Sequence, residues 1–313
     1  MKTLGLVFPG QGSQSLGMLA DIANEFTEVE ETFAEASTVL GYDLWKLTFE
    51  GPAEELDKTV HTQPALLTAS YAIWRILKQK KNIQPTWLAG HSLGEYTALV
   101  CANALAFTDA VGLVAARGAY MQEAVPAGEG ALAAIVGLDD AVVKTICEKA
   151  AQTEVLAPAN YNSPGQIVIA GQTTAVTRAI LLAKEAGAKL AKQLSVSVPS
   201  HCSLMKPAAE KLAARLAATQ INKPTIPVIN NVDVVIYENE MGIREGLIRQ
   251  LSSPVRWVET INLLAKLGCT QLIECGPGKV LSGLNKRIVS DIQLANTADL
   301  ANLQNLLALS FSA

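Results

Sequence analysis

The 313-residue sequence has few aromatic residues, few charged residues and no excess of positive charge. Aromatic residues make up 5% of the chain, charged residues 17%, and the formal net charge is −4 at pH 7. A chain with this balance has no general electrostatic reason to bind nucleic acid or an anionic membrane. Half of the residues are hydrophobic, which suits a well-buried globular enzyme. We expect no nucleic-acid or membrane partner.

The sequence also lacks a paired cysteine pattern and a long uninterrupted apolar segment. Its five cysteines are odd in number and show no Cys-x-x-Cys spacing, which predicts free thiols in a reducing compartment and no metal site. The apolar run at 3–8 is too short for a signal peptide. The apolar run at 88–107 is interrupted by His91 and Glu95, so we expect a buried helix there and not a membrane span. The predicted location is the cytoplasm.

The most informative segment is Gly90-His91-Ser92-Leu93-Gly94. It follows a short predicted strand and opens an apolar predicted helix, which is the context of a nucleophile elbow. Glycines on both sides of Ser92 let the backbone turn tightly, so that the hydroxyl is exposed at the edge of a sheet. The backbone N–H of Leu93 would then face an oxygen that becomes negative during acyl transfer.

Strands and helices alternate through most of the chain, which predicts an α/β fold with a largely parallel sheet. A strand at 3–8 runs into the glycine-rich turn 9–14, which lacks the Gly-x-Gly-x-x-Gly pattern, so no dinucleotide cofactor is predicted. The other predicted elements are helices at 28–40, 62–81, 109–123, 204–219, 244–251, 255–267 and 279–289 and strands at 227–231 and 272–275. His61 is predicted to lie in a loop ahead of the helix 62–81. The final twenty residues show no assignable pattern.

The pattern changes between residues 126 and 197. Strands are predicted at 131–138, 154–160, 166–171 and 189–196, with helices at 139–151 and 174–186. This βαββαβ order is the ferredoxin-like plan. We therefore predict a hydrolase-like core formed by 1–125 and 198–313, with an inserted ferredoxin-like small domain at 126–197 that acts as a lid or wall over Ser92.

Activation of Ser92 requires a general base within hydrogen-bond reach. His91 adjoins the serine and must point away, and His61 has nothing to orient it, which leaves His201 by elimination. The group that would orient His201 stays open. The candidates are a carboxylate, the side-chain amide of Gln250 or Asn230, or a main-chain carbonyl, and the candidate carboxylates are Asp233, Glu238, Glu240 and Glu274.

Arg117 is the single charged residue in the apolar stretch 111–121. A lone arginine in such a helix is either the partner of a buried ion pair or the receptor for an anion in a pocket. Sequence alone does not choose between these interpretations.

Six motifs, taken together and in this order, resemble those of the malonyl-CoA:acyl-carrier-protein transacylases of bacterial fatty acid synthesis. The resemblance runs from residue 3 to about residue 290, and its motifs are Phe8-Pro9-Gly10-Gln11-Gly12-Ser13-Gln14, Gly90–Tyr96, Arg117, Asn160–Pro164, Val198–His201 and Glu274–Gly278.

The resemblance implies a role for each matching position. Ser92 would be the nucleophile and His201 the general base, oriented by the main-chain carbonyl of Gln250. The backbone N–H groups of Gln11 and Leu93 would bind the oxyanion. Arg117 would hold the free carboxylate of the malonyl group, and Gln63 and Asn162 would line the pocket.

The resemblance further implies a ping-pong transfer of malonate from malonyl-CoA, through an ester on Ser92, to the phosphopantetheine thiol of an acyl carrier protein. We expect a monomer with no permanently bound cofactor. Two other activities stay open: a discrete acyltransferase that serves a polyketide synthase, and a serine thioesterase or hydrolase. Because carrier proteins are acidic, docking on basic residues is expected, and the candidates are Lys189, Lys192, Lys279, Lys286 and Arg287.

Overall fold

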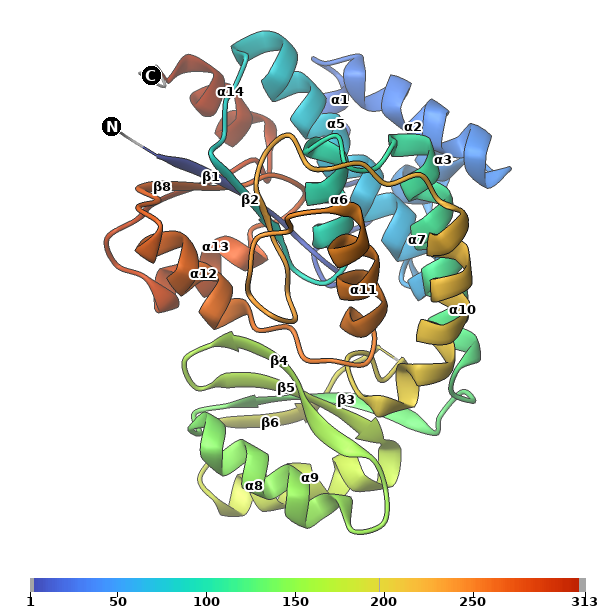
Figure 1. The fold of residues 1–313 in the computed structure, drawn as a ribbon, viewed down its shortest axis with the longest axis vertical. Helices are drawn as coiled ribbons and strands as arrows, with labels where there is room; N and C mark the ends of the chain where they lie inside the picture. Colours follow the sequence, from blue (N-terminus) through green and yellow to red (C-terminus); the bar gives the residue numbers. More distant parts are fainter. Residues whose placement is uncertain (1–2, 197, 310–313) are drawn as a thin grey trace.

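The computed structural model describes residues 3–196 and 198–309, and in these residues the strands form two separate sheets (Figure 1). The larger sheet has five parallel strands in the order β7-β2-β1-β8-β9. Its strands are β1 (Leu4–Phe8), β2 (Trp87–Gly90), β7 (Val228–Ile229), β8 (Gln271–Glu274) and β9 (Gln293–Asn296). The predicted parallel α/β core is confirmed.

The central strand β1 carries side chains into a separate core on each face of this sheet. Leu6 and Phe8 pack into the core formed with α5 and α7, whereas Val7 packs into the core formed with α12 and α13. Successive residues of a strand point to opposite faces, so an uninterrupted apolar strand must be covered on both. This explains why helices flank both faces of the sheet.

The helices of the large part lie in three groups along the chain. The segment before β2 holds α1 (Ala20–Ala23), α2 (Glu28–Leu40), α3 (Leu44–Glu50), α4 (Ala53–Leu56) and α5 (Thr59–Lys81). The segment after β2 holds α6 (Gly94–Cys101) and α7 (Phe107–Glu123). The C-terminal segment holds the short 3-10 helix Ser203–Met205, α10 (Lys206–Ala218), α11 (Glu240–Gln250), α12 (Trp257–Lys266), α13 (Val280–Ile288) and α14 (Leu300–Ala308).

The smaller sheet is antiparallel and has the strand order β4-β5-β3-β6. Its elements run in the predicted βαββαβ order: β3 (Gly130–Val136), α8 (Asp140–Ala151), β4 (Leu156–Ser163), β5 (Gln166–Gln172), α9 (Thr173–Glu185) and β6 (Leu190–Gln193). The ferredoxin-like insertion is therefore confirmed. Figure 1 shows α8 and α9 on the side of this sheet that faces away from the larger sheet.

The edge strand β4 fastens the small sheet to the large part of the chain. The N–H of Tyr161 donates to the Val255 carbonyl at 2.9 Å, and the N–H of Val255 donates to the Ala159 carbonyl at 2.9 Å. These bonds join β4 to the segment that leads into α12. The predicted division of the chain at 126–197 remains a prediction, and the elements of the small sheet lie between residues 130 and 193.

One local prediction was wrong, and the last described residues form elements that were not predicted. His61 lies in the first turn of α5 and not in a loop, because that helix begins at Thr59, well before Pro64. The last described residues form β9 and α14, where no pattern was assigned. α14 buries Leu303 and Leu306 in the main core, and the edge strand β9 is only four residues long.

Candidate active site

The turn that carries Ser92 is held tight by contacts that only glycine permits. Ser92 has a φ of 51°, a strained left-handed conformation for a residue with a side chain. A Cβ on Gly90 would lie 1.9 Å from the carbonyl carbon of Gly94, and a Cβ on Gly94 would lie 2.0 Å from the Phe8 carbonyl oxygen. The spacing Gly-x-Ser-x-Gly therefore follows from the close packing of β2, α6 and the end of β1.

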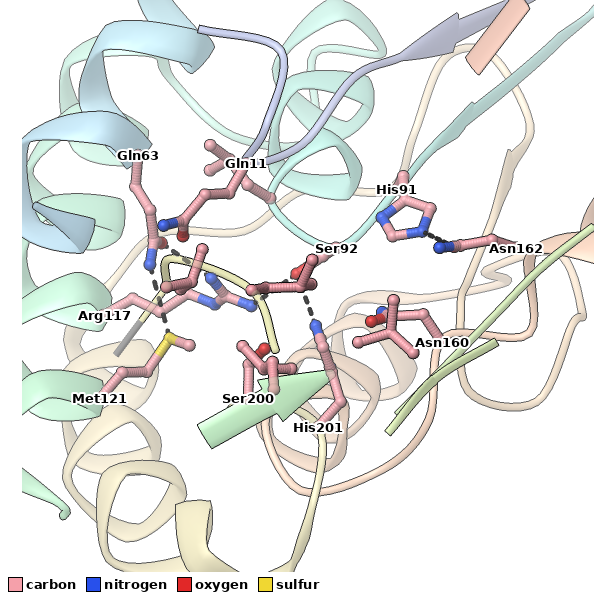
Figure 2. A pocket seen from close by; sticks show the side chains of 15 residues that line it. Gln11, Gln63, His91, Ser92, Arg117, Met121, Asn160, Asn162, Ser200 and His201 are labelled. Carbon is pink, nitrogen blue, oxygen red and sulfur yellow. Dashed lines mark hydrogen bonds between the residues drawn. The ribbon is translucent and has the colours of Figure 1, made fainter. Parts of the chain in front are cut away.

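His201 makes a hydrogen bond through each of its ring nitrogens. Its Nε2 lies 2.8 Å from Oγ of Ser92, and its Nδ1 lies 2.8 Å from the main-chain oxygen of Gln250 (Figure 2 shows the first of these). A carbonyl oxygen only accepts, so Nδ1 carries the proton and Nε2 is free to accept the proton of the serine hydroxyl. Burial, with the nearby Arg117 charge, lowers the pKa of His201 to about 3.

The four candidate carboxylates lie in other environments. Asp233 pairs with Arg249 at 2.8 Å, and Glu274 accepts the N–H groups of Leu281 and Ser282 at the start of α13. Glu238 and Glu240 are exposed. Among the described residues, the hydrogen-bond partner of the His201 Nδ1 is the Gln250 main chain. The geometry thus favours a serine–histidine pair oriented by a carbonyl.

Arg117 lies within hydrogen-bond distance of the same serine. It projects from α7, is 1% exposed, and donates from Nη2 to Oγ of Ser92 at 3.2 Å. Its Nη1 donates to Gln63 Oε1 at 2.8 Å and its Nη2 to Gln250 Oε1 at 3.0 Å. In residues 3–196 and 198–309, no carboxylate forms an ion pair with this guanidinium. The contacts favour the anion-receptor interpretation over the structural ion pair.

The N–H groups of Gln11 and Leu93 come from two adjacent turns at the carboxyl end of the sheet. The N–H of His91 donates to the Phe8 carbonyl at 3.0 Å, and a Cβ on Gly10 would lie 2.5 Å from the His91 oxygen. Within the described part of the chain, neither N–H has an acceptor. Two unpaired donors beside a nucleophile are the arrangement that stabilises an oxyanion.

These groups line one cavity of about 210 Å³ that lies between the two sheets. Figure 2 shows Gln11, Gln63 and Arg117 on one side of Ser92, and His91 and Asn162 on the other. The face of the small sheet opposite α8 and α9 contributes Leu132 and Val168 to the apolar lining, and the segment after β6 contributes Leu194 and Val196. The small sheet is therefore a wall of the site.

Asn162 reaches the elbow from β4. Its Oδ1 lies 2.8 Å from Nε2 of His91, so Nε2 is the donor in this bond (Figure 2). The side chain of His91 points away from His201, as expected from its place next to Ser92. The bond ties β4 to the turn that carries Ser92.

Sequence reasoning missed two residues that support the elbow. Asn231 accepts the Ser92 N–H at 2.7 Å and donates from Nδ2 to the Gly90 carbonyl at 2.6 Å. Glu95, noted only as an interruption of an apolar run, is 0% exposed and accepts the Asn231 N–H at 2.9 Å. A carboxylate inside an apolar helix was the available signal for Glu95, whereas no local signal marks Asn231.

Among residues 3–196 and 198–309, no three His, Cys, Asp or Glu side chains lie so that they could hold a metal ion. A membrane-spanning helix is not found in that part of the chain either, because its helices are too short or too polar. All five cysteines are buried and free.

A strained serine on a strand–turn–helix, a neutral histidine and a pair of free N–H groups can together carry an acyl group as an ester. Known proteins agree with this class. The family model described as an acyl transferase domain matches residues 6–303. The malonyl CoA-acyl carrier protein transacylase of Escherichia coli K12 is 59% identical over 93% of this chain and 94% of its own. That of Haemophilus influenzae is 58% identical over 96% of this chain and 97% of its own.

Solved structures give the same result. An acyl carrier protein S-malonyltransferase from Vibrio cholerae has a TM-score of 0.95 at 57% identity, over 97% of this chain and 100% of its own. A malonyl-transacylase in complex with a type II polyketide synthase acyl-carrier protein has a TM-score of 0.96 at 55% identity, over 98% of this chain and 99% of its own. The chain belongs to the acyl transferase family and, within it, to the malonyl CoA-acyl carrier protein transacylases.

Proposed function

We propose that this enzyme transfers a malonyl group from malonyl-CoA to the phosphopantetheine thiol of an acyl carrier protein, through a malonyl ester on Ser92. The observation that carries the proposal is the buried guanidinium of Arg117, 3.2 Å from Oγ of Ser92 and without an ion-pair partner among the described residues. A planar, permanently charged fork in this position suits a substrate that carries a free carboxylate next to its thioester.

The first half-reaction forms the ester. Nε2 of His201 takes the proton of the Ser92 hydroxyl while Oγ attacks the thioester carbon. The carbonyl oxygen becomes negative and is bound by the N–H groups of Gln11 and Leu93. When the tetrahedral intermediate collapses, the C–S bond breaks and the His201 proton passes to the departing coenzyme A sulfur.

The second half-reaction runs the same steps with the carrier thiol as the nucleophile. His201 takes the thiol proton, the sulfur attacks the ester carbon, and the C–O bond to Ser92 breaks as the proton returns to Oγ. The ester must survive until the carrier arrives. The apolar lining supplied by Leu132, Val168 and Leu194 limits the water that reaches it.

The test is a mass measurement on the intact protein. Malonyl-CoA should add one malonyl group to the wild type and none to Ser92→Ala, and added carrier protein bearing phosphopantetheine should remove the group. An adduct that water removes before the carrier is added would favour a thioesterase or hydrolase and contradict the proposal. An acetyl adduct formed as readily as the malonyl adduct would contradict the role of Arg117.

A second carrier is favoured by one comparison, the malonyl-transacylase solved with a polyketide synthase carrier protein. The rates of malonyl transfer from the enzyme to carriers of fatty acid synthesis and of polyketide synthesis distinguish these two roles. We propose that fatty acid synthesis is the main one. We propose the cytoplasm as the location of this reaction.

We propose that the carrier docks on basic side chains that are exposed at the two parts of the chain framing the site: Lys189, Lys192, Lys279, Lys286 and Arg287. Arg287 also donates to Gln166 Oε1 at 2.7 Å and so joins α13 to β5. Reversal of the charge at two of these positions should slow transfer to the carrier and leave acylation by malonyl-CoA unchanged. Equal slowing of both steps would contradict docking there.

A further inference from the structure

Glu95 is a fully buried carboxyl group that the proposed reaction does not use. It lies on α6, three positions after the nucleophile, and is 0% exposed. Its Oε1 lies 2.5 Å from the Tyr237 hydroxyl, and its Oε2 lies 2.9 Å from the Asn231 N and 2.8 Å from Gln250 Nε2. These bonds join α6 to the connection that holds Asn231 and Tyr237 and to the end of α11.

The orientation of the Gln250 amide is decided by its neighbours. Its Oε1 faces Nη2 of Arg117, which can only donate, and its Nε2 faces the Ser92 carbonyl at 3.1 Å, which can only accept. Nε2 therefore also donates to Glu95. The amide is a bridge that accepts from the guanidinium and donates to the carboxyl group.

The contacts favour the ionised form of Glu95. The Asn231 N–H and the Gln250 amide can only donate to it, and the Tyr237 hydroxyl can donate as well. Burial raises the pKa of Glu95 to about 7, against the opposing effect of these hydrogen bonds and of the Arg117 charge. The titratable groups around Glu95 are Tyr237, Arg117 and Tyr96. The nearby His201 is bound by the main-chain oxygen of Gln250. At a pH above about 7, the buried carboxylate of Glu95 is therefore negative.

A buried arginine requires a negative charge nearby, yet a carboxylate bound directly to it would occupy the donors that a substrate needs. We propose that Glu95 is a positioning residue that compensates the charge of Arg117 across the Gln250 amide, so that the guanidinium stays available for the carboxylate of the malonyl group. Through Asn231, which also accepts the Ser92 N–H, the same carboxylate holds the nucleophile turn. The inference rests on the proposed role of Arg117.

The first test is Glu95→Gln at pH 8, where the wild-type carboxyl is ionised. The new amide can keep all three contacts, because the Tyr237 hydroxyl can turn and accept from it, so that mainly the charge is lost. Without that negative charge the site attracts anions more strongly. The ratio of Ser92 acylation by malonyl-CoA to acylation by acetyl-CoA, each as kcat/KM, should rise by about fivefold. A purely structural role would leave this ratio unchanged or lower it.

The matched control is Glu274→Gln, which removes another buried carboxylate, 1% exposed, that caps α13. It should lower the thermal stability and leave the malonyl-to-acetyl ratio at the wild-type value. A ratio that stays unchanged or falls in folded Glu95→Gln overturns the inference.

A second variant keeps the inference testable if Glu95→Gln does not fold. The double variant Glu95→Gln/Gln250→Glu retains one buried carboxylate but places it against Arg117. Because the guanidinium is then occupied, the malonyl-to-acetyl ratio should fall by about tenfold or more. The ratio is the readout because the swap also removes the bond to the Ser92 carbonyl and slows both acylations. A ratio at or above the wild-type value overturns the inference.

Failure of this inference is distinguishable from failure of the proposed function. Arg117→Ala tests the receptor alone. If it removes the malonyl preference while Glu95→Gln leaves the ratio unchanged, the function stands and the role of Glu95 is wrong. If Arg117→Ala keeps the preference, the proposed function fails first.

Discussion

Nε2 of His201 lies 2.8 Å from Oγ of Ser92, and both residues have a positive φ, 64° and 51°. Two strained backbones, 109 positions apart in sequence, therefore meet at one hydrogen bond. Such conformations persist only where the surrounding structure holds them. Here the Asn231 side chain holds the serine turn, and the N–H of His201 donates to the Leu251 carbonyl at 2.9 Å.

We predict that His201 stays neutral at acidic pH. Burial and the Arg117 charge lower its pKa to about 3 from an ordinary 6.5. Its imidazole NMR signals, assigned by their loss in His201→Ala, should keep the neutral position from pH 8 to pH 5. An unfolded chain protonates this side chain, so its contribution to stability is lost as the pH falls from 6.5 toward about 3. A titration midpoint near 6.5 would contradict this.

We predict that Arg117→Ala removes the malonyl preference. Acylation by malonyl-CoA should fall by about 1000-fold, since a bidentate charged pair is lost, while acylation by acetyl-CoA changes less than about tenfold. Arg117→Lys keeps the charge but loses the planar guanidinium that donates to Gln63 and Gln250. It should therefore recover only part of the lost rate of acylation by malonyl-CoA. Rates with the two acyl-CoA substrates decide the question, and parallel losses for both would disprove selection by this side chain.

We predict that Asn231→Ala slows acylation by about 100-fold and lowers the free energy of unfolding by about 1–3 kcal/mol, because it leaves the Ser92 N–H and the Gly90 carbonyl unpaired. The neighbouring Asn230→Ala is the control. Asn230 is 1% exposed, and its side-chain bonds to described residues lie within the turn 230–235. It should lose similar stability and keep its acylation rate. Equal rates in the two variants would exclude a special role for Asn231.

We predict that Gly94→Ala prevents folding, because its Cβ would lie 2.0 Å from the Phe8 carbonyl oxygen. Gly112→Ala, inside α7, has its nearest neighbour at 3.5 Å. There the added methyl group should raise the free energy of unfolding by about 0.5–1 kcal/mol, since alanine favours the helix. Yield of folded protein and urea denaturation measure both effects. Normal folding of Gly94→Ala would show that the turn can relax.

Much of the fold could be predicted because its signals are local. The glycines on both sides of Ser92, the apolar strand at 4–8 and the βαββαβ order of 130–193 each lie in one short stretch of chain. His201 could be chosen because the chain has only three histidines. The last helix, α14, could not be assigned from the sequence, because it follows an edge strand of only four residues.

The sequence by itself determined the α/β class, the inserted small sheet and the tight turn that carries Ser92, because backbone sterics and the alternation of apolar side chains act between close neighbours. Only the tertiary structure decided which groups position Ser92 and its partner His201. Gln250, Asn231 and Glu95 come from separate helices and turns, and they converge because parallel strands bring their carboxyl ends to one edge. A hydrogen-bond network between such distant positions leaves no periodic trace in the chain, since each bond depends on a distance that folding alone sets.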